Sequence, residues 1–535
     1  MTWPTQVEIE LGLDDPDDDL ALRAAVARKL GTSAASLPTL AVRRRALDSR
    51  RGRPRFHLLI QIAAGDPQSA LHAAAPREVD TQRRVVIVGA GPAGLFCAYQ
   101  LARFGIGCTV VDRGKLVQPR RRDLKGLTRH GKVDEDSNYC FGEGGAGTYS
   151  DGKLYTRADK RGNVRDVLEI LVQHGAPAEI LIDARPHVGS NRLPKVVTAL
   201  RERLQSVGVE FLFGKRVTGL LLSKDSPAKG GKTRNDADRH IAGVAFSDGT
   251  QLEAQQVVMA TGHSARDVQQ LLLEAGEPLE AKPFALGVRI EHPQPLINKI
   301  QYGRFSGHPR LPAASYRLAS NLGDSKVFSF CMCPGGFVVP SMTEAGSIVV
   351  NGMSLSKRNS PFANSGFVVG LEPHHFDQAG FHGPLGGVAL QQAIERAAFA
   401  AGNAMLAAPA TRMTDFLAGR GSTTVPKSSY VPGLVAADLA PVLNATGLPL
   451  AAQLQAALKD IGKKMPQYLS EEAVLIGVES RTSSPVRVVR DPETLMSPKT
   501  QGLYPCAEGA GYAGGILSAA LDGMNVAHKI AASLQ

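Results

Sequence analysis

The stretch Val85-Val86-Ile87-Val88-Gly89-Ala90-Gly91-Pro92-Ala93-Gly94-Leu95 joins a continuous apolar run to a glycine-rich turn. Such a run is typical of a parallel strand buried on both faces, and helical spacing follows the turn from Pro92 to Phe104. A second strand is predicted from Ile106 to Val111, and it ends at Asp112. A strand, a glycine-rich turn, a helix, a second strand and an acidic residue, in this order, predict a Rossmann-type dinucleotide site.

Each glycine of the turn has a physical role in such a site. Gly89 allows the tight turn, Gly91 lets the backbone approach a pyrophosphate, and Gly94 lets the helix pack closely on the strand. Pro92 can open the helix because the first helical turn does not need the N–H that proline lacks, and the free amides and dipole of that turn attract an anion. The alternative is a plain strand-to-helix turn without a ligand.

The G-x-G-x-x-G spacing occurs twice more, at residues 142–147 and 509–514. Neither copy is followed by a strand that ends in an acidic residue about 20 positions on, which a dinucleotide site needs for the ribose. We therefore expect the 142–147 loop to be a nest of backbone amides beside the same cofactor. The 509–514 loop precedes a long helix that is predicted to start near Gly515.

The chain is predicted to be an α/β protein with three parts. Its 535 residues exceed the ~250 to 300 at which a single hydrophobic core stops growing. Residues 1–80 have the pattern of a small N-terminal α+β module. Residues 81–274 and 471–535 are predicted to form a discontinuous Rossmann-type domain, and residues 275–470 an inserted α+β substrate domain, because strands and helices are mixed there.

The N-terminal module carries a basic segment. Its expected elements are strands at 7–11, 40–43 and 56–63 and a helix at 20–30. Between the last two strands lie Arg43-Arg44-Arg45 and Arg50-Arg51-Gly52-Arg53-Pro54-Arg55, interpreted as a solvated basic hairpin, with RNA or an acidic partner as the alternative. Elsewhere, the stretch 226–239 lacks core-forming residues and is expected to be a flexible hairpin insertion that tolerates deletion.

Composition and charge limit the partners and the cellular compartment that we expect for the protein. The formal charge of +11 favours anionic partners. The six cysteines lack the spacing of a metal site, so no metal is expected, and their scarcity favours a reducing compartment. There is no basic and apolar leader at the N-terminus and no apolar run of 18 residues, so we expect a soluble, cytoplasmic protein without a membrane segment.

Four further motifs carry a family resemblance. These are the stretches 142–154 (GEGGAGTYSDGKL), 330–336 (FCMCPGG), 479–485 (ESRTSSP) and 508–515 (EGAGYAGG). Together with the first turn and Ala260-Thr261-Gly262, they resemble FAD-dependent oxidoreductases of the glutathione reductase type. Within that superfamily the chain resembles, over nearly its full length, a bacterial group of uncharacterised FAD-dependent dehydrogenases.

The resemblance implies that FAD is the ligand of the first turn. It implies that Asp112 contacts the adenosine ribose, that the backbone at Val217 meets the adenine and that the terminal helix directs its dipole at the flavin. Glu508 stands where many relatives have the aspartate of a G-D motif. The predicted FAD-binding residues are Gly89, Gly91, Pro92, Ala93, Gly94, Asp112, Arg113, Gly144, Gly145, Ala146, Gly147, Thr148, Asp151, Val217, Ala260, Thr261, Gly262, Glu508, Gly514, Gly515 and Ile516.

Candidate reacting residues come from the middle and late chain. By hypothesis, Arg481 and Lys427 bind an anionic substrate and Glu479 orients Arg481, with Arg289 as a further candidate near the flavin. The alternative is a structural ion pair at the domain boundary. A thiol–disulfide mechanism at Cys140 is disfavoured, because that cysteine stands alone on its loop.

Cys331 and Cys333 form a C-x-C whose side chains share one face of a predicted strand. Three interpretations remain open for them. They could be redox-active, Cys331 could line the substrate site, or both could be buried, inert thiols.

The resulting prediction is an FAD-dependent oxidoreductase that transfers hydride between flavin and a small metabolite, unsaturated or anionic. Because no second nicotinamide-binding unit is visible, NAD(P)H as electron donor would bind transiently in the substrate cleft. One alternative is an FAD protein that binds or modifies RNA through the basic hairpin. Another is a structural FAD in a partner-binding module. No pattern in the sequence specifies an oligomeric state.

Overall fold

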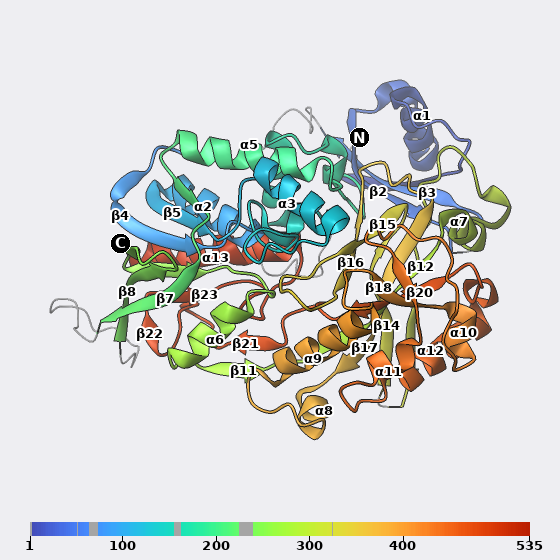
Figure 1. Ribbon diagram of the computed structural model, residues 1–535. Coiled ribbons are helices and arrows are strands. Elements are labelled where there is room, and N and C mark those ends of the chain that lie inside the picture. Colours follow the sequence, from blue (N-terminus) through green and yellow to red (C-terminus); the bar gives the residue numbers. More distant parts are fainter. Residues whose placement is uncertain are drawn as a thin grey trace.

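The computed structural model describes residues 3–50, 52–63, 73–154, 162–223, 239–323 and 325–534. The predicted insertion at 226–239 lies outside these ranges, apart from its last residue, Arg239. Figure 1 shows a small N-terminal module in dark blue, a parallel sheet with its helices in light blue, green and red, and a second domain in yellow and orange. The predicted fold class, a Rossmann-type domain with an α+β domain and a small N-terminal module, is confirmed.

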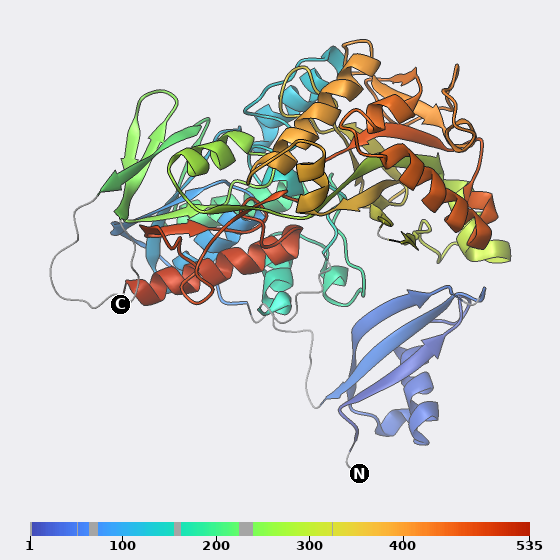
Figure 2. The ribbon, with the colours of Figure 1, turned by 90° about the horizontal axis from the view of Figure 1, so that it is seen from below.

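The N-terminal module is a three-stranded antiparallel sheet with one helix. Its strand order is β1-β3-β2. The elements are β1 (Gln6–Leu11), α1 (Asp19–Leu30), β2 (Thr39–Asp48) and β3 (Arg55–Ala63). The module has a hydrophobic core of its own and lies at one end of the molecule (Figure 2). Arg43 to Arg45 belong to β2 rather than to the predicted connection, because β2 keeps its pairing with β3 past a register shift there.

The Rossmann-type domain is built on a five-stranded parallel sheet of order β23-β10-β4-β5-β6. Its strands are β4 (Asp80–Val88), β5 (Ile106–Asp112), β6 (Glu210–Phe213), β10 (Gln256–Met259) and β23 (Leu503–Pro505). The run from Val85 to Val88 is apolar throughout because both faces are covered: Val85 and Ile87 belong to one hydrophobic core, Val86 and Val88 to another.

The chain order of the strands changes direction between β4 and β10. From β4 the chain proceeds to β5 and β6 on one side, whereas β10 and β23 are added on the other. In open parallel sheets the carboxyl ends of strands at such a switch point form the ligand crevice. The turn at Gly89 follows β4, and Ala260 to Gly262 follow β10, so both predicted segments lie at this crevice.

Two helices that begin at this crevice pack directly on each other. They are α2 (Pro92–Phe104) and α13 (Ile516–Ser533), and a Cβ added at Gly523 of α13 would lie 2.1 Å from the carbonyl oxygen of Ala93. The backbones are therefore in contact. The other helices of this domain are α3 (Val117–His130), α4 (Val164–Gln173), α5 (Leu193–Ser206) and α6 (Arg266–Glu274). A small sheet adds β7 (Val217–Ser223), β8 (Arg239–Phe246), β9 (Gln251–Glu253) and β22 (Thr500–Gln501).

The second domain is a seven-stranded mixed sheet with helices. The strand order is β13-β14-β17-β12-β20-β18-β19. In chain order these are β12 (Phe284–Pro293), β13 (Ala319–Leu322), β14 (Ser325–Cys333), β17 (Phe362–Leu371), β18 (Ala408–Arg412), β19 (Leu434–Ala436) and β20 (Val474–Glu479). Its helices are α7 (Gln294–Tyr302), α8 (Pro373–Gln378), α9 (Gly386–Ala401), α10 (Met413–Leu417), α11 (Leu439–Leu443) and α12 (Leu450–Lys464).

The boundary between the two large domains differs from the expectation. β20 lies in the second sheet, paired with β12 and β18, so the change of sheet comes after Glu479 and not at residue 471. Two strand pairs complete the fold: β11 (Leu279–Ala281) with β21 (Val486–Val488), and β15 (Gly336–Pro340) with β16 (Val350–Ser354). Within the described ranges, no helix has both the length and the apolar character needed to cross a bilayer.

Candidate functional site

One cavity of about 600 Å³ gathers most of the predicted FAD-binding residues. This volume is within the range of cofactor sites, ~300 to 1,000 Å³. The predicted residues that line it are Gly89, Gly91, Pro92, Ala93, Asp112, Gly145, Ala146, Gly147, Asp151, Ala260, Thr261, Gly262, Glu508, Gly514, Gly515 and Ile516. Of the predicted reacting residues, Arg481 lines it as well.

The first turn is shaped by close backbone contacts at two glycines and left open at the third. Gly89 has φ +110°, and a Cβ there would lie 2.3 Å from the carbonyl oxygen of Ala260. A Cβ at Gly94 would lie 1.9 Å from the carbonyl oxygen of Gly89. At Gly91, in contrast, the nearest atom to an added Cβ is the Cα of Gly145, at 3.8 Å. The protein itself therefore leaves free the space that a pyrophosphate would need.

Asp112 ties three loops together at the end of β5. Its carboxylate accepts hydrogen bonds from the amides of Ala90 at 2.8 Å, Gly114 at 2.8 Å and Gly142 at 3.0 Å. The side chain borders the cavity, and a carboxylate has about four acceptor positions, so it retains capacity for a ribose hydroxyl. Its neighbour Arg113 turns away, to Asp267 at 2.5 Å.

The second glycine loop is held by an arginine that the sequence analysis missed. Arg120 on α3 is fully buried, and its guanidinium donates to the carbonyls of Asn138, Tyr139, Glu143 and Gly145 at 2.8 to 3.0 Å. Gly144 donates its amide to Ala90 at 2.8 Å, which docks this loop on the first turn. Thr148 is buried and donates to Glu143, so it shapes the loop from behind instead of lining the cavity.

Two helix N-termini open on the cavity. α2 begins after Gly91 and α13 after Gly515, and neither helix has a side-chain cap. Their first amides are thus available to an anion. Glu508 lies beside α13, with Oε1 3.6 Å from Nδ1 of His263, a cavity residue that was not predicted. Val217 is buried in the core at the start of β7 and is not part of the lining.

An ionic cluster lies at the cavity wall beside Cys331, a lining residue of the second domain. Asp151 is contacted by Lys153 at 3.2 Å and by Arg358 at 2.5 Å, and it accepts a hydrogen bond from Ser354. Burial alone would raise the pKa of Asp151, but these two cations lower it to about 2. Lys153 also lies between the sulfurs of Cys331 and Cys333.

The hypothesis that Glu479 orients Arg481 is wrong. Glu479 forms a fully buried bidentate pair with Arg289, at 2.7 and 3.0 Å, because the pairing of β12 with β20 places the two residues together. Arg481 is held by Glu395 of α9, at 3.2 and 3.0 Å, and donates to Thr343 at 2.7 Å. Both arginines thus form buried ion pairs, Arg289 with Glu479 inside the second sheet and Arg481 with Glu395 of α9.

The other predicted reacting residues lie outside the lining. Arg289 lies behind the cavity wall, where it donates to Asn351 at 3.2 Å and, at 3.4 Å, to the carbonyl of Cys331. Lys427 is exposed and does not reach the cavity, so the structure does not bring it together with Arg481. Sequence spacing could not reveal Glu479, Asn351 and Cys331 as partners of Arg289, since these residues lie on other strands.

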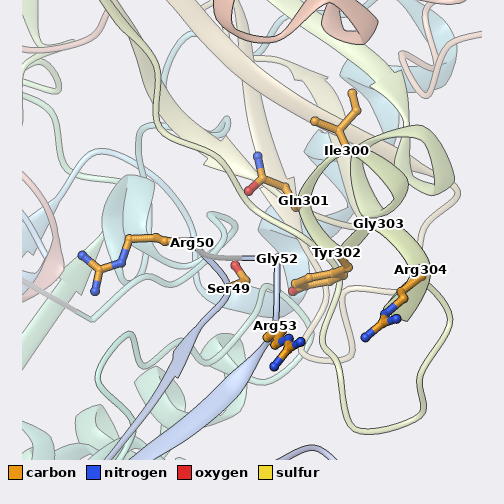
Figure 3. Close-up of a pocket in the computed structure, with 9 residues that line it drawn as sticks. All are labelled: Ser49, Arg50, Gly52, Arg53, Ile300, Gln301, Tyr302, Gly303 and Arg304. Carbon is orange, nitrogen blue, oxygen red and sulfur yellow. The ribbon is translucent and has the colours of Figure 1, made fainter.

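A second hollow, of about 580 Å³, lies where the turn between β2 and β3 approaches the end of α7. Figure 3 shows Arg53 and Gly52 of the turn across from Tyr302 and Arg304, with the guanidinium of Arg50 directed away. Three arginines of the basic segment form ion pairs within the chain. Arg45 pairs with Asp183 at 3.0 Å, Arg50 with Asp48 at 2.7 Å and Arg55 with Glu10 at 3.6 Å.

Two family models match the chain. Residues 283–482 match the family described as "FAD-dependent protein, C-terminal domain-like", and residues 82–127 match an FAD binding domain. A protein of Clostridium beijerinckii, described as uncharacterized, is 36% identical over 536 residues, covering 96% of each chain. The chain belongs to this family of FAD-dependent proteins. FAD is its cofactor, and it is a flavin-dependent oxidoreductase.

Solved structures of other flavoproteins have low sequence identity and low structural similarity to this chain. CtdE in complex with FAD is 12% identical, with 84% of each chain covered and a TM-score of 0.33. FqzB is 12% identical over 86% of this chain and 77% of that one, with a TM-score of 0.34. The assignment of the chain to its family therefore rests on the sequence matches. The finer resemblance to the glutathione reductase type stays a prediction, because the matching FAD binding domain model is a different branch.

Proposed function

We propose that the protein transfers hydride between its flavin and a small anionic metabolite bound at the second-domain wall of the cavity. The observation that carries this proposal is the continuity of the cavity. It is lined both by the dinucleotide turn and by polar residues of the second domain, such as Asn351. In a flavoenzyme the cofactor supplies the hydride chemistry, so the protein needs only to place a substrate against it and tune the charge nearby.

For the cofactor, we propose that the turn from Gly89 to Ala93, the loop from Gly145 to Gly147 and the start of α13 hold FAD. The open space at Gly91 and the two uncapped helix N-termini support this assignment, because both suit a pyrophosphate. Asp112 would bind the ribose. Glu508 would lie near the ribityl chain, by its resemblance to the aspartate of related enzymes.

The charge of the cavity wall supports an anionic substrate. Glu395 is shared by Arg481 and Arg266, so two buried cations meet a single buried carboxylate. Glu344 also contacts Arg266, at 3.3 Å, but its side chain is 36% exposed and is therefore screened by water. Arg481 borders the cavity, where its guanidinium can attract a carboxylate. Lys427 takes no part in this proposal.

Anaerobic mixing of the FAD-loaded protein with small carboxylates, NADH and NADPH tests the proposal. A substrate should bleach the flavin absorption band at a rate that saturates with its concentration. Replacing Arg481→Gln should raise KM for the carboxylate by at least about tenfold, the equivalent of ~1.4 kcal/mol, and leave KM for the neutral amide of the same compound nearly unchanged. A flavin that only dithionite reduces would instead indicate a structural FAD.

A further inference from the structure

Cys331 and Cys333 lie at an irregular point of the second sheet. The pairing of β14 with β17 shifts register between Phe330 and Cys333, and Cys331 has φ +44°, in the left-handed region that non-glycine residues rarely adopt. Such a bulge bends a strand and re-aims its side chains, and bulges are common beside active sites. The bend is located between the two cysteines.

Both thiols contact one ammonium group. Lys153 Nζ is 3.7 Å from the sulfur of Cys331 and 3.6 Å from that of Cys333, and Cys333 Sγ lies 3.3 Å from the carbonyl oxygen of Cys331. Cys331 is half-buried and lines the cavity, whereas Cys333 is fully buried and does not. One thiol therefore faces the ligand space, and the other lies directly behind it.

The charges of this cluster would stabilise a thiolate at Cys331, the cysteine that lines the cavity. Lys153 and Arg358 share the single carboxylate Asp151, which leaves one positive charge in excess. A hydrogen bond from Cys333, together with the charges of Lys153 and Arg289, lowers the pKa of Cys331 well below its usual range. The same hydrogen bond raises the pKa of Cys333. One sulfur is thus a nucleophile while the other keeps its proton.

The remaining cysteines lack this environment. Burial raises the pKa of Cys108 to about 12, and it also raises the pKa of Cys97 and Cys506. Cys140 borders the cavity, and its sulfur lies 3.8 Å from the hydroxyl and 3.9 Å from the carbonyl oxygen of Ser341. In the described structure Lys153 thus contacts the sulfurs of both Cys331 and Cys333, whereas Cys140 interacts with the charges of Arg481 and Arg120, and Cys506 with that of Arg490, at longer range.

We infer that Cys331 and Cys333 are a redox-active dithiol that exchanges two electrons with the flavin of this cavity by closing to a disulfide. The inference rests on the proposed function only in taking that flavin as the electron partner. In the closing direction the Cys331 thiolate forms the S–S bond with Cys333 as the S–H bond of Cys333 breaks. Two electrons and the proton of that S–H bond pass to FAD, which would become FADH⁻, so atoms and charge balance.

The geometry is compatible with such a bond. Residues two apart on a regular strand have Cα atoms ~6.6 Å apart, two rises of ~3.3 Å. This is near the upper end of the disulfide range, ~4.4 to 6.8 Å, and the bulge bends the strand between the two residues. A disulfide formed here would be the labile kind that cycles, since strained disulfides are the more oxidising ones.

Anaerobic reductive titration of the oxidised holoenzyme tests the inference. The wild-type protein should take up two electrons more per FAD than free FAD does, because the disulfide is a second two-electron acceptor. The excess should vanish in Cys331→Ser and in Cys333→Ser and persist in Cys140→Ser, the matched cavity cysteine. Equal uptake by wild type and Cys331→Ser would overturn the inference.

A second readout does not require the flavin. After oxidation with diamide, the apoprotein should lose two alkylatable thiols, and mass spectrometry should place both in the peptide that contains Met332. Replacing Lys153→Met should shift alkylation of Cys331 to higher pH, since the thiolate loses its cation. If both thiols are still alkylated after oxidation, the inference is wrong. Failure of the proposed function is separate: it appears as a flavin that no substrate reduces, whatever the thiol count.

Discussion

His292 lies fully buried on β12, where Nε2 is 2.8 Å from the carbonyl oxygen of Tyr468. The described residues offer no partner to its other ring nitrogen, Nδ1. A second proton on the ring would therefore be buried without an acceptor, and burial lowers the pKa of His292 to about 4. The neutral imidazole is part of the native packing.

This buried imidazole predicts a pH dependence of stability. Between pH ~6.5 and about pH 4, His292 is protonated in the unfolded chain but neutral in the folded chain. The free energy of unfolding should thus fall as pH is lowered through this window, by up to about 1.4 kcal/mol per pH unit. His292→Gln keeps a donor for Tyr468 and cannot titrate, so its denaturant-unfolding free energy should fall less steeply. Parallel curves for the two proteins would contradict the prediction.

Replacing Gly91 should test cofactor binding while leaving the fold nearly unchanged. Its φ of −75° suits alanine, and the added Cβ would meet no atom closer than 3.8 Å. Gly91→Ala should cost the apoprotein only a few tenths of a kcal/mol at the helix cap, about 0.5, but weaken FAD binding at least about tenfold, because the methyl group occupies the space for the pyrophosphate. Fluorescence titration with FAD measures this.

Gly126→Ala is the matched control for that experiment. Its Cβ would lie 3.9 Å from the nearest atom, the carbonyl oxygen of Lys132, and Gly126 lies on α3 away from the cavity lining. The FAD dissociation constant should stay within about twofold of the wild-type value. Equal FAD binding by Gly91→Ala and Gly126→Ala would mean that the pyrophosphate does not approach this turn.

At the scale of elements, the second glycine loop depends on Arg120 of α3. Replacing Arg120→Met would remove one donor from four carbonyl oxygens in a buried site; those of Glu143 and Gly145 keep a donor from Thr148, whereas those of Asn138 and Tyr139 lose theirs. At ~1 to 3 kcal/mol for each of the two carbonyls left unsatisfied, the loss of unfolding free energy should be at least about 2 kcal/mol. Arg122→Met, at an exposed position of the same helix, should change it by less than about 0.5 kcal/mol. Chemical unfolding of both variants tests the difference.

The elements also show what the sequence could and could not predict. The strand, turn, helix and second strand from Val85 to Asp112 were predictable because every signal is local: an apolar run, three glycines and a proline at the first helical position. The partners of Arg289 and Arg481 were not. Glu479 is brought to Arg289 by strand register, and Glu395 is brought to Arg481 by the packing of α9, 86 residues away in the chain.

Boundaries were missed for a similar reason. The strand from Val474 to Glu479 is apolar and buried, as strands of either sheet would be, so its residues do not reveal which sheet it joins. The charges of Arg43 to Arg45 indicated a connection, although β2 continues through them, with Arg43 and Arg45 half-buried and Arg44 exposed. In both cases the pairing partner decides, and pairing is a property of the whole chain.

At the scale of the molecule, the cavity lies between separate hydrophobic cores. The parallel sheet has one core on each face, and the second domain has its own. Both large domains line the ligand space: the first with glycine-rich turns, helix ends, Asp151 and Lys153, and the second with residues such as Cys331 and Asn351. A substrate bound there would contact both domains, so its affinity would depend on how they are held together.

The contact between Gly523 and Ala93 has a consequence for the synthesis of the protein. On the ribosome, the glycine-rich turn and α2 leave the exit tunnel long before α13 is made. Until then a nascent chain presents the turn without the helix that packs on it and without the strand β23 beside β10. The proposed FAD site, to which the start of α13 contributes, is therefore complete only once residues 516–533 have been synthesised.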